Sequence, residues 1–151
     1  MKSTIANNRK ALFNYEIIKE YEAGISLKGW EVKSIKKADI SLKESHIDFQ
    51  KGELFIYNFY VKPWEFASDL SESASTQPRK LLLRKPELSQ LFGKKQQKGY
   101  TIVPLDIHLT RGFIKIRMAL AKGLTKGDKR SKLKEKEQKR EIERDLKSIG
   151  Y

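Results

Sequence analysis

Cysteine is absent from this chain of 151 residues, and histidine occurs only twice, as His46 and His108. Without cysteine there is no disulfide framework, no thiolate nucleophile and no thiolate metal ligand. Two isolated histidines cannot complete a Cys/His zinc site either. We therefore expect no metal and interpret both histidines as ordinary surface residues.

Long apolar runs and catalytic motifs are missing as well. A membrane-spanning helix needs about 18 or more consecutive apolar residues, and the sequence holds no such run. The first residues also lack the apolar segment of a signal peptide, so we expect a cytoplasmic protein without a membrane partner. No glycine-rich phosphate loop is present, and neither histidine accompanies a serine nucleophile motif. These absences predict a protein that is not an enzyme and uses no cofactor.

Negative charge is scarce relative to positive charge. Lys and Arg number 32 against 19 Asp and Glu, which gives a net charge of +13, and fifteen aromatic residues are available for base stacking. A basic chain with aromatic side chains favours nucleic acid over anionic lipid or acidic protein as its partner. The chain length predicts a single domain with a tail.

The last thirty residues form the predicted tail. Residues 122–151 contain eleven Lys or Arg, six Asp or Glu and only six apolar residues. Such a segment buries too little apolar surface to offset the entropy of ordering, although most of its residues are good helix formers. We expect a core domain over residues 1–121 and a basic C-terminal tail over residues 122–151. The tail is expected to be disordered when free and to become ordered on a polyanionic partner.

The body of the chain alternates mainly with period two, which is typical of β-strands. Residues 15–28 place Glu16, Glu20 and Glu22 on one face of a strand, with Gly24 as a bend or bulge. Residues 47–61 predict a hairpin around Lys51-Gly52 whose second strand runs from 53 to 61. The clearest hairpin pairs residues 103–109 with 114–120 around Arg111-Gly112, and Lys115 and Arg117 face away from its apolar stripe.

Helical signals are fewer. One short helix is expected near Trp30, and another begins at Pro86 and ends before Gly93. Residues 65–78 are rich in serine and predict a loop. Several short antiparallel strands with two or three short helices indicate a mainly β fold, an OB-type antiparallel β-barrel.

Seven short motifs make the prediction more specific. In order and spacing they resemble the family of SsrA-binding proteins, also called small protein B, over about residues 6–146. The motifs are Asn7-Asn8-Arg9-Lys10-Ala11, Tyr21-Glu22-Ala23-Gly24-Ile25, Gly29-Trp30-Glu31-Val32-Lys33-Ser34, Arg79-Lys80-Leu81-Leu82-Leu83, Gly99-Tyr100-Thr101-Ile102-Val103-Pro104-Leu105, Ala121-Lys122-Gly123 and Asp128-Lys129-Arg130.

The resemblance implies a function. Members of this family bind transfer-messenger RNA (tmRNA) and deliver it, charged with alanine, to stalled bacterial ribosomes for trans-translation. The barrel is expected at the elbow of the RNA, as a monomer in a 1:1 complex. The tail is expected to probe the decoding centre and the empty mRNA channel of the small subunit as a helix.

The same resemblance assigns residues to each partner. For RNA binding it implies Asn8, Arg9, Glu22, Arg79, Lys80, Leu82, Lys115 and Lys122. For ribosome binding it implies Lys126, Asp128, Lys129, Arg130 and Leu146. Gly127 departs from the family, many of whose members carry an aromatic residue or histidine there.

The residues alone leave other interpretations open. Glu22 on a strand face is typical of a cross-strand partner for lysine, and Leu82 within an apolar triplet is typical of core packing. A generic OB-type protein that binds single-stranded nucleic acid is the alternative function. A nuclease would need a metal-binding carboxylate cluster, which Glu16, Glu20 and Glu22 could imitate if they share a face.

Overall fold

The computed structural model describes residues 2–64 and 72–123. These residues form, in chain order, β1 (Lys2–Asn7), α1 (Arg9–Asn14), β2 (Tyr15–Ile25), α2 (Gly29–Lys36), β3 (Ile40–Ser41), β4 (His46–Gln50), β5 (Glu53–Tyr57), β6 (Tyr60–Val61), the 3-10 helix η1 (Glu72–Thr76), β7 (Arg79–Leu82), α3 (Lys85–Lys95), β8 (Tyr100–Thr110) and β9 (Phe113–Gly123). The tail from residue 124 lies outside the described residues, and so does the part of the serine-rich loop before Glu72.

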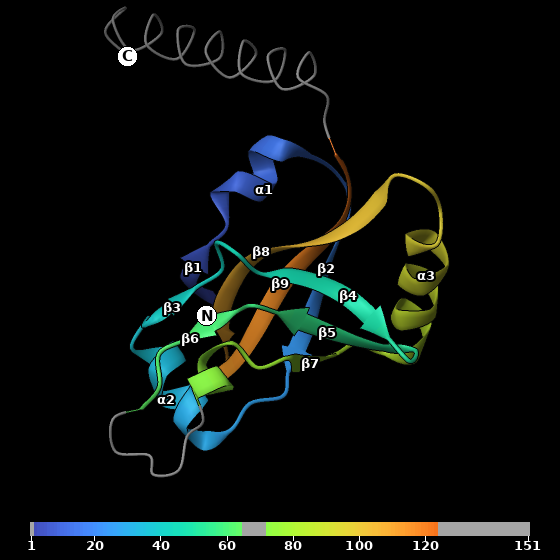
Figure 1. The fold of residues 1–151 in the computed structure, drawn as a ribbon. Helices are drawn as coiled ribbons and strands as arrows, with labels where there is room; N and C mark the ends of the chain where they lie inside the picture. The colour runs from blue at the N-terminus through green and yellow to red at the C-terminus, as the bar shows by residue number, and fades with distance from the viewer. Residues whose placement is uncertain (1, 65–71, 124–151) are drawn as a thin grey trace, which may run out of the picture.

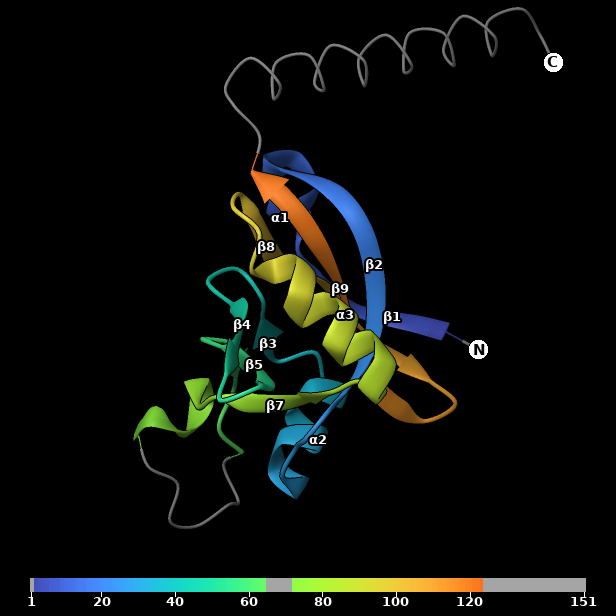
Figure 2. The same ribbon diagram turned by 90° about the vertical axis from the view of Figure 1, so that its right-hand side faces the viewer.

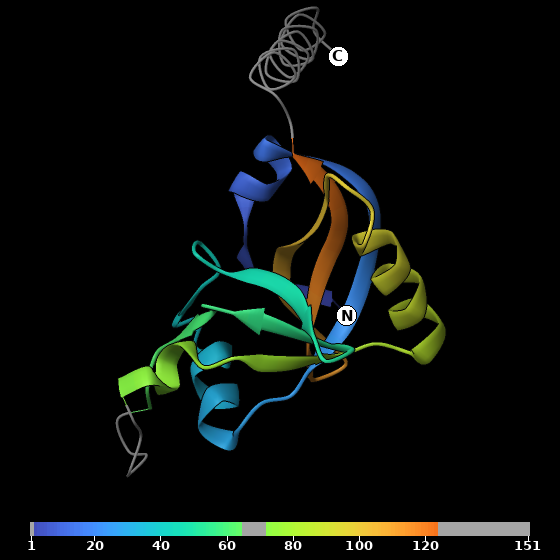
Figure 3. The same cartoon turned by 45° about the vertical axis from the view of Figure 1, so that its right-hand side comes forward.

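The strands close into a barrel. A seven-stranded antiparallel sheet has the order β1-β8-β4-β5-β7-β2-β9, and the additional pairing of β8 with β9 closes the strands from β8 to β9 into a ring, with β1 paired to β8 outside it. Figure 3 shows β4, β5 and β7 as a layer that crosses the long strands β8, β9 and β2. In Figure 1, α1 lies at the upper end of this barrel and α2 at the lower end. The mainly β, OB-type fold expected from the sequence is confirmed.

The barrel interior is filled by apolar residues from every wall. Its largest fully buried side chains include Ile56, Ile107, Ile116, Met118 and Leu120. From α2 and α3, Ile35 and Leu91 join the same core. Each such side chain contributes about 1.5–3 kcal/mol on burial, so the interior is where folding stability concentrates.

Two β-bulges change which face the long strands present. The register of β2 against β9 shifts between Ile17 and Lys19, and that of β8 against β9 shifts between Pro104 and Asp106. An extra residue in one strand reverses the alternation of its side chains relative to the partner strand. The expected bulge at Gly24 is wrong, because Gly24 pairs regularly with Lys115.

These bulges correct two face assignments. Glu16 lies opposite Lys122, on the face of Tyr21, whereas Glu20 and Glu22 lie on the other face. In β8, Val103 and Leu105 pack outside the barrel, whereas Ile107 packs inside it. The apolar stripe expected along residues 103–109 is therefore divided between the barrel interior and a small core outside it.

Both predicted hairpin turns are confirmed. Lys51 and Gly52 have φ of 53° and 77°, and Arg111 and Gly112 have φ of 52° and 82°. Positive φ at both central residues is what a type I′ turn requires. The strand predicted over 53–61 is wrong in length. The chain turns at Asn58, which has φ of 55°, just after β5 ends. The following strand, β6, pairs with β3 in a separate two-stranded sheet.

The helices cover different parts of the barrel. The predicted α2 and α3 are confirmed, although α3 continues past Gly93 to Lys95. In α3, Phe92 meets Phe49 of β4 edge to face with ring centroids 5.1 Å apart. On the opposite wall, the pKa of Tyr21 is raised by burial and by the charge of Glu87, so its neutral hydroxyl faces Gln90 of α3. No helix among the described residues is long and apolar enough to cross a membrane.

Helix α1 was not predicted. Its Ala11 packs outside the barrel on Val103, Leu105, Ala119 and Ala121, a small core that the bulge in β8 creates. Because α1 occupies only the upper part of the β2–β9–β8 sheet, no other element among residues 2–64 and 72–123 covers the lower part of that outer face.

Candidate nucleic-acid interface

The uncovered outer face of β2, β9 and β8 carries most of the predicted RNA-binding residues. Figure 2 shows β2 and β9 running side by side along the barrel. One row across the sheet contains Leu82, Gly24, Lys115 and His108, which pair in register through β7, β2, β9 and β8. The neighbouring row contains Glu22, Arg117 and Asp106. We call these two rows the polar face.

Glu22, Leu82 and Lys115 lie close together on this polar face. A methyl group placed on Gly24 would lie 3.5 Å from Cβ of Leu82 and 3.8 Å from Nζ of Lys115. Leu82 is 51% exposed, so the core-packing alternative is wrong for this residue. Because Gly24 has no side chain, Leu82 and Lys115 approach each other over its backbone and leave a gap of only about methyl size.

An ion network underlies the polar face. Arg117 places Nε 2.7 Å from Oδ2 of Asp106 and Nη1 3.6 Å from Oε2 of Glu20. The other oxygen of Asp106 is 2.7 Å from Nδ1 of His108. Glu22, with a side chain 46% exposed, places Oε2 3.3 Å from Nε2 of the same histidine. The face thus mixes fixed cations with an exposed carboxylate that can accept hydrogen bonds from base amino or imino groups.

His108 corrects one interpretation from the sequence. It was expected at the surface, yet it is fully buried, whereas His46 is exposed. The reason is the bulge at Leu105, which turns Asp106 and His108 onto the outer face between β9 and β1. There, neighbouring side chains cover the ring, and Thr4 of β1 is its strand partner.

Lys80 fits the predicted interface and Arg79 does not. Lys80 follows the alternation of Leu82 onto the outer face and forms an ion pair of 3.1 Å with Glu53. Arg79 points inward with only 2% exposure. Its guanidinium forms an ion pair with Glu31 and donates to carbonyl oxygens of Phe59, Ala74 and Ser75. Because its donors are occupied inside the protein, the position of Arg79 does not support the predicted RNA contact.

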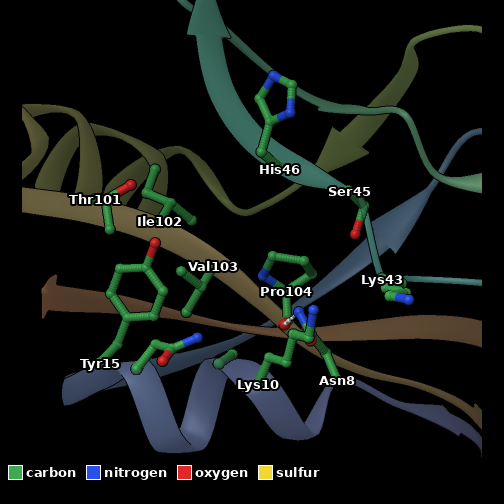
Figure 4. Close-up of a pocket in the computed structure, with 12 residues that line it drawn as sticks. Asn8, Lys10, Tyr15, Lys43, Ser45, His46, Thr101, Ile102, Val103 and Pro104 are labelled. Carbon is green, nitrogen blue, oxygen red and sulfur yellow. Dashed lines mark hydrogen bonds between the residues drawn. The ribbon is translucent and has the colours of Figure 1, made fainter. Parts of the chain in front are cut away.

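Asn8 and Arg9 lie in a second region, where Asn8 joins β1 to α1 and Arg9 is the first residue of α1. The amide of Asn8 donates to the carbonyl oxygen of Pro104 at 3.0 Å. Figure 4 shows the hollow that this residue lines, with α1 and β8 on one side and Lys43, Ser45 and His46 on the other. An adjoining hollow adds Arg9, and Asn8, Lys10 and Lys43 line both hollows.

This second region is basic. Arg9, Lys10 and Lys43 contribute cations, and among the lining residues of the two hollows there is no carboxylate. It can therefore receive a phosphodiester backbone. We call it the basic groove.

Lys122 lies near the end of β9, exposed, with its ammonium 4.8 Å from the ring centroid of Tyr100. Its strand partner in β2 is Glu16. The other predicted residues of the tail, Lys126, Asp128, Lys129, Arg130 and Leu146, lie outside the described residues. Lys122 and Gly123 belong to the barrel, two residues beyond the boundary expected from the sequence.

Sequence reasoning missed three groups on the polar face. Phe113, the most exposed large apolar side chain among those described at 68%, follows the alternation of Lys115 and Arg117. An exposed aromatic ring beside cations is a platform for base stacking. Asp106 and His108 were visible as polar residues within an apolar strand, but only the bulge shows that they lie beside Glu22.

Comparison with known proteins gives consistent matches. Residues 5–148 match the family model described as "SmpB protein". The SsrA-binding protein of Fusobacterium nucleatum is 46% identical over 144 residues, which cover 95% of this chain and 97% of that protein. The SsrA-binding protein of Persephonella marina is 47% identical over 143 residues, with coverage of 95% and 93%.

A solved structure also matches the fold. It is described as "tmRNA-SmpB: a journey to the center of the bacterial ribosome" and superposes with a TM-score of 0.64 at 42% sequence identity. The match covers 83% of this chain and 91% of the chain in that structure.

Proposed function

The chain belongs to the SmpB protein family, and from this premise we propose that it is a tmRNA-binding adaptor that delivers alanyl-tmRNA to stalled bacterial ribosomes for trans-translation. It acts as a monomer in a 1:1 complex with the RNA, in the cytoplasm, and performs no catalysis. One observation carries the assignment of the site: Glu22, Leu82 and Lys115, far apart in sequence, lie together on the uncovered outer face.

The polar face, with Lys80 and Phe113 on the same outer side of the sheet, would supply three kinds of contact. Lys115 and Lys80 neutralise phosphates, which gives affinity without sequence preference. Glu22 accepts hydrogen bonds from base edges, since a carboxylate is repelled by phosphate. Leu82 and the exposed ring of Phe113 offer apolar surface to unstacked bases. Together they favour a folded RNA with exposed bases over a regular duplex.

The basic groove would hold a second stretch of RNA backbone. Arg9, Lys10 and Lys43 surround Asn8, whose amide is already fixed by Pro104. Because this groove and the polar face lie on different parts of the barrel, two separate RNA segments can contact the protein at once. That arrangement suits a folded RNA better than a single extended strand.

The tail supplies the ribosomal step in this proposal. The ten cations after Gly123 would meet phosphates of ribosomal RNA in the decoding centre and the empty mRNA channel, where Lys126, Asp128, Lys129, Arg130 and Leu146 engage the small subunit. If residues 128–151 form a helix there, it spans roughly 36 Å at about 1.5 Å per residue. An mRNA bound in the channel would exclude the tail helix, so the tail can enter only a stalled ribosome whose channel is empty.

A proline in the tail tests this helix. Arg140→Pro would interrupt it at a cost on the order of 3 kcal/mol. We expect barrel folding and tmRNA binding to be unchanged and tagging of stalled chains to be strongly reduced, measured in a reconstituted translation reaction. Arg140→Ala is the matched control, because it removes the same charge and permits a helix. Tagging by Arg140→Pro at the level of Arg140→Ala would rule out the helical tail.

Selective binding tests the function itself. We expect tmRNA to bind more tightly than tRNA, and both more tightly than an unstructured oligonucleotide, in gel shifts at one fixed salt concentration. Equal affinity for the oligonucleotide would favour the alternative, a generic OB-type protein for single-stranded nucleic acid. The nuclease alternative loses its basis, since the bulge in β2 separates Glu16 from Glu20 and Glu22.

A further inference from the structure

The buried histidine of the polar face has one nitrogen with a partner and one without. Nδ1 of His108 lies 2.7 Å from Oδ1 of Asp106 in a hydrogen bond. Nε2 is also buried and lies 3.3 Å from Oε2 of Glu22, but it has no hydrogen-bond partner among the described residues. A buried nitrogen left unpaired is costly, and here the nearest acceptor is the carboxylate that the proposed function assigns to RNA.

The charge of the imidazole decides what Nε2 does. Asp106 accepts a hydrogen bond, so Nδ1 carries a proton. A neutral ring then presents the lone pair of Nε2 to the oxygen of Glu22, and the two acceptors repel each other. A protonated ring presents an N–H instead, which can donate to Oε2 of Glu22 after a small rotation of that exposed side chain.

We propose that His108 is a positioning residue for RNA recognition, and that its protonation fixes the carboxylate of Glu22 in the orientation that accepts hydrogen bonds from a base of tmRNA. One oxygen of Glu22 is held by Nε2–H, and the other remains free for the base. Asp106 fixes the ring through Nδ1, and Arg117 in turn holds Asp106. This inference rests on the proposed function, because it requires Glu22 to contact RNA.

The surroundings of the ring set the direction of the pH effect. From β9, Lys115 pairs with His108 and Arg117 lies in the next row. From β2, Glu22 faces the ring and Glu20 lies beyond it, next to Arg117. On the side of β1 the strand partner is Thr4, which does not titrate in this range. Two carboxylates thus contact the two ring nitrogens, so a proton on His108 is matched by opposite charge.

RNA binding should therefore take up a proton. Protonation of His108 holds the carboxylate of Glu22 in the orientation that accepts hydrogen bonds from the base. A ligand that prefers the protonated state binds more weakly as pH rises. We expect the affinity for the tRNA-like fragment of tmRNA to be about tenfold lower at about pH 8 than at about pH 5.5.

Two substitutions separate positioning from packing. His108→Gln replaces the imidazole with an amide. The amide N–H can still donate to Glu22, but the side chain carries no charge at any pH. We expect it to bind the fragment at pH 8 at least as tightly as the parent, with no pH dependence. His108→Phe fills the space without a donor and should bind about tenfold more weakly than the parent at pH 5.5. All comparisons are made in a His46→Gln background, because His46 is the chain's other histidine and lines the basic groove.

The combination with Glu22→Ala shows whether His108 acts through Glu22. In that background, His108→Phe should cause no further loss of affinity, and the pH dependence should already be absent. Thermal unfolding checks each variant. If His108→Phe fails to fold, the pH profiles of the parent, Glu22→Ala and His108→Gln still show whether His108 acts through Glu22.

The outcomes distinguish this inference from the proposed function. If Glu22→Ala weakens binding yet keeps the pH dependence of the parent, or if His108→Gln keeps it, the positioning role is wrong while the interface stands. If Glu22→Ala binds the fragment as the parent does at every pH, the assignment of the interface itself is wrong.

Discussion

Neighbouring residues of like charge have opposite roles on this barrel. Arg79 and Lys80 are adjacent in β7, and the family resemblance assigns both to RNA binding. Strand alternation sends the first inward to Glu31 and the second outward to Glu53. A buried ion pair with one partner removed leaves an uncompensated charge, whereas an exposed pair contributes little to stability.

The pair gives a matched prediction for stability. Arg79→Met should lower the free energy of unfolding by about 3–5 kcal/mol, because Glu31 and three carbonyl oxygens lose their donor. Lys80→Met should change it by less than about 1 kcal/mol and weaken RNA binding instead. Urea unfolding and gel shifts measure the two effects. The reverse pattern would show that Arg79 is the RNA contact.

On the polar face, salt dependence separates Lys115 from Glu22. Lys115→Ala should weaken tmRNA binding and reduce the slope of log affinity against log salt by about one unit, because one phosphate contact is lost. Glu22→Ala should weaken binding without that reduction. Titrations at several salt concentrations measure both. An equal loss of slope in the two variants would mean that Glu22 acts electrostatically rather than on a base.

At the scale of elements, the sequence predicts strands well and their faces less well. Type I′ turns and regular alternation in β9 were readable, because glycine and period two leave local signals. The bulges in β2 and β8 leave no such signal. The extra residues, Ile18 and Leu105, look like ordinary strand residues, yet each reverses the face on which the following side chains lie. The site was therefore predicted for Glu22, Leu82 and Lys115, and missed for Asp106 and His108.

The end of α2 offers a test that is independent of RNA. The N–H of Asp39 donates to Ser34 and that of Ala38 to Ile35, the pattern of a Schellman motif, and Ala38 has φ of 63°. A left-handed conformation costs a residue with a Cβ roughly 1–2 kcal/mol. We expect Ala38→Gly to raise the free energy of unfolding by about 1 kcal/mol with tmRNA affinity unchanged, as measured by urea unfolding and gel shifts. Destabilisation would contradict this account of the motif.

At the scale of the whole molecule, the proposed function divides between barrel and tail. The predicted RNA contacts that can be placed all lie within the described barrel, and the family match continues to residue 148. Since β9 extends to Gly123, the division falls after this residue.

Truncation tests the division. A chain that ends at Gly123 keeps every strand pair of the barrel, so it should retain most of its affinity for tmRNA and lose tagging of stalled chains. Gel shifts and reconstituted translation measure the two. A chain cut at Lys115 removes most of β9 and should not fold, which provides the negative control. Loss of tmRNA binding in the first truncation would show that the tail belongs to the RNA interface.

Strand β9 has a further consequence as a spacer of fixed length. It carries Lys115 near one end and passes the chain to the tail at Gly123, while pairing with β2 on one edge and β8 on the other. Eight residues at about 3.4 Å each set a separation of roughly 27 Å that neither binding partner can stretch. An RNA held at Lys115 therefore determines where the tail begins its path. Residues inserted after Gly123 would lengthen the connection to the tail without disturbing the sheet. The distance between the RNA contact at Lys115 and the ribosome-binding tail can therefore be varied without changing either one.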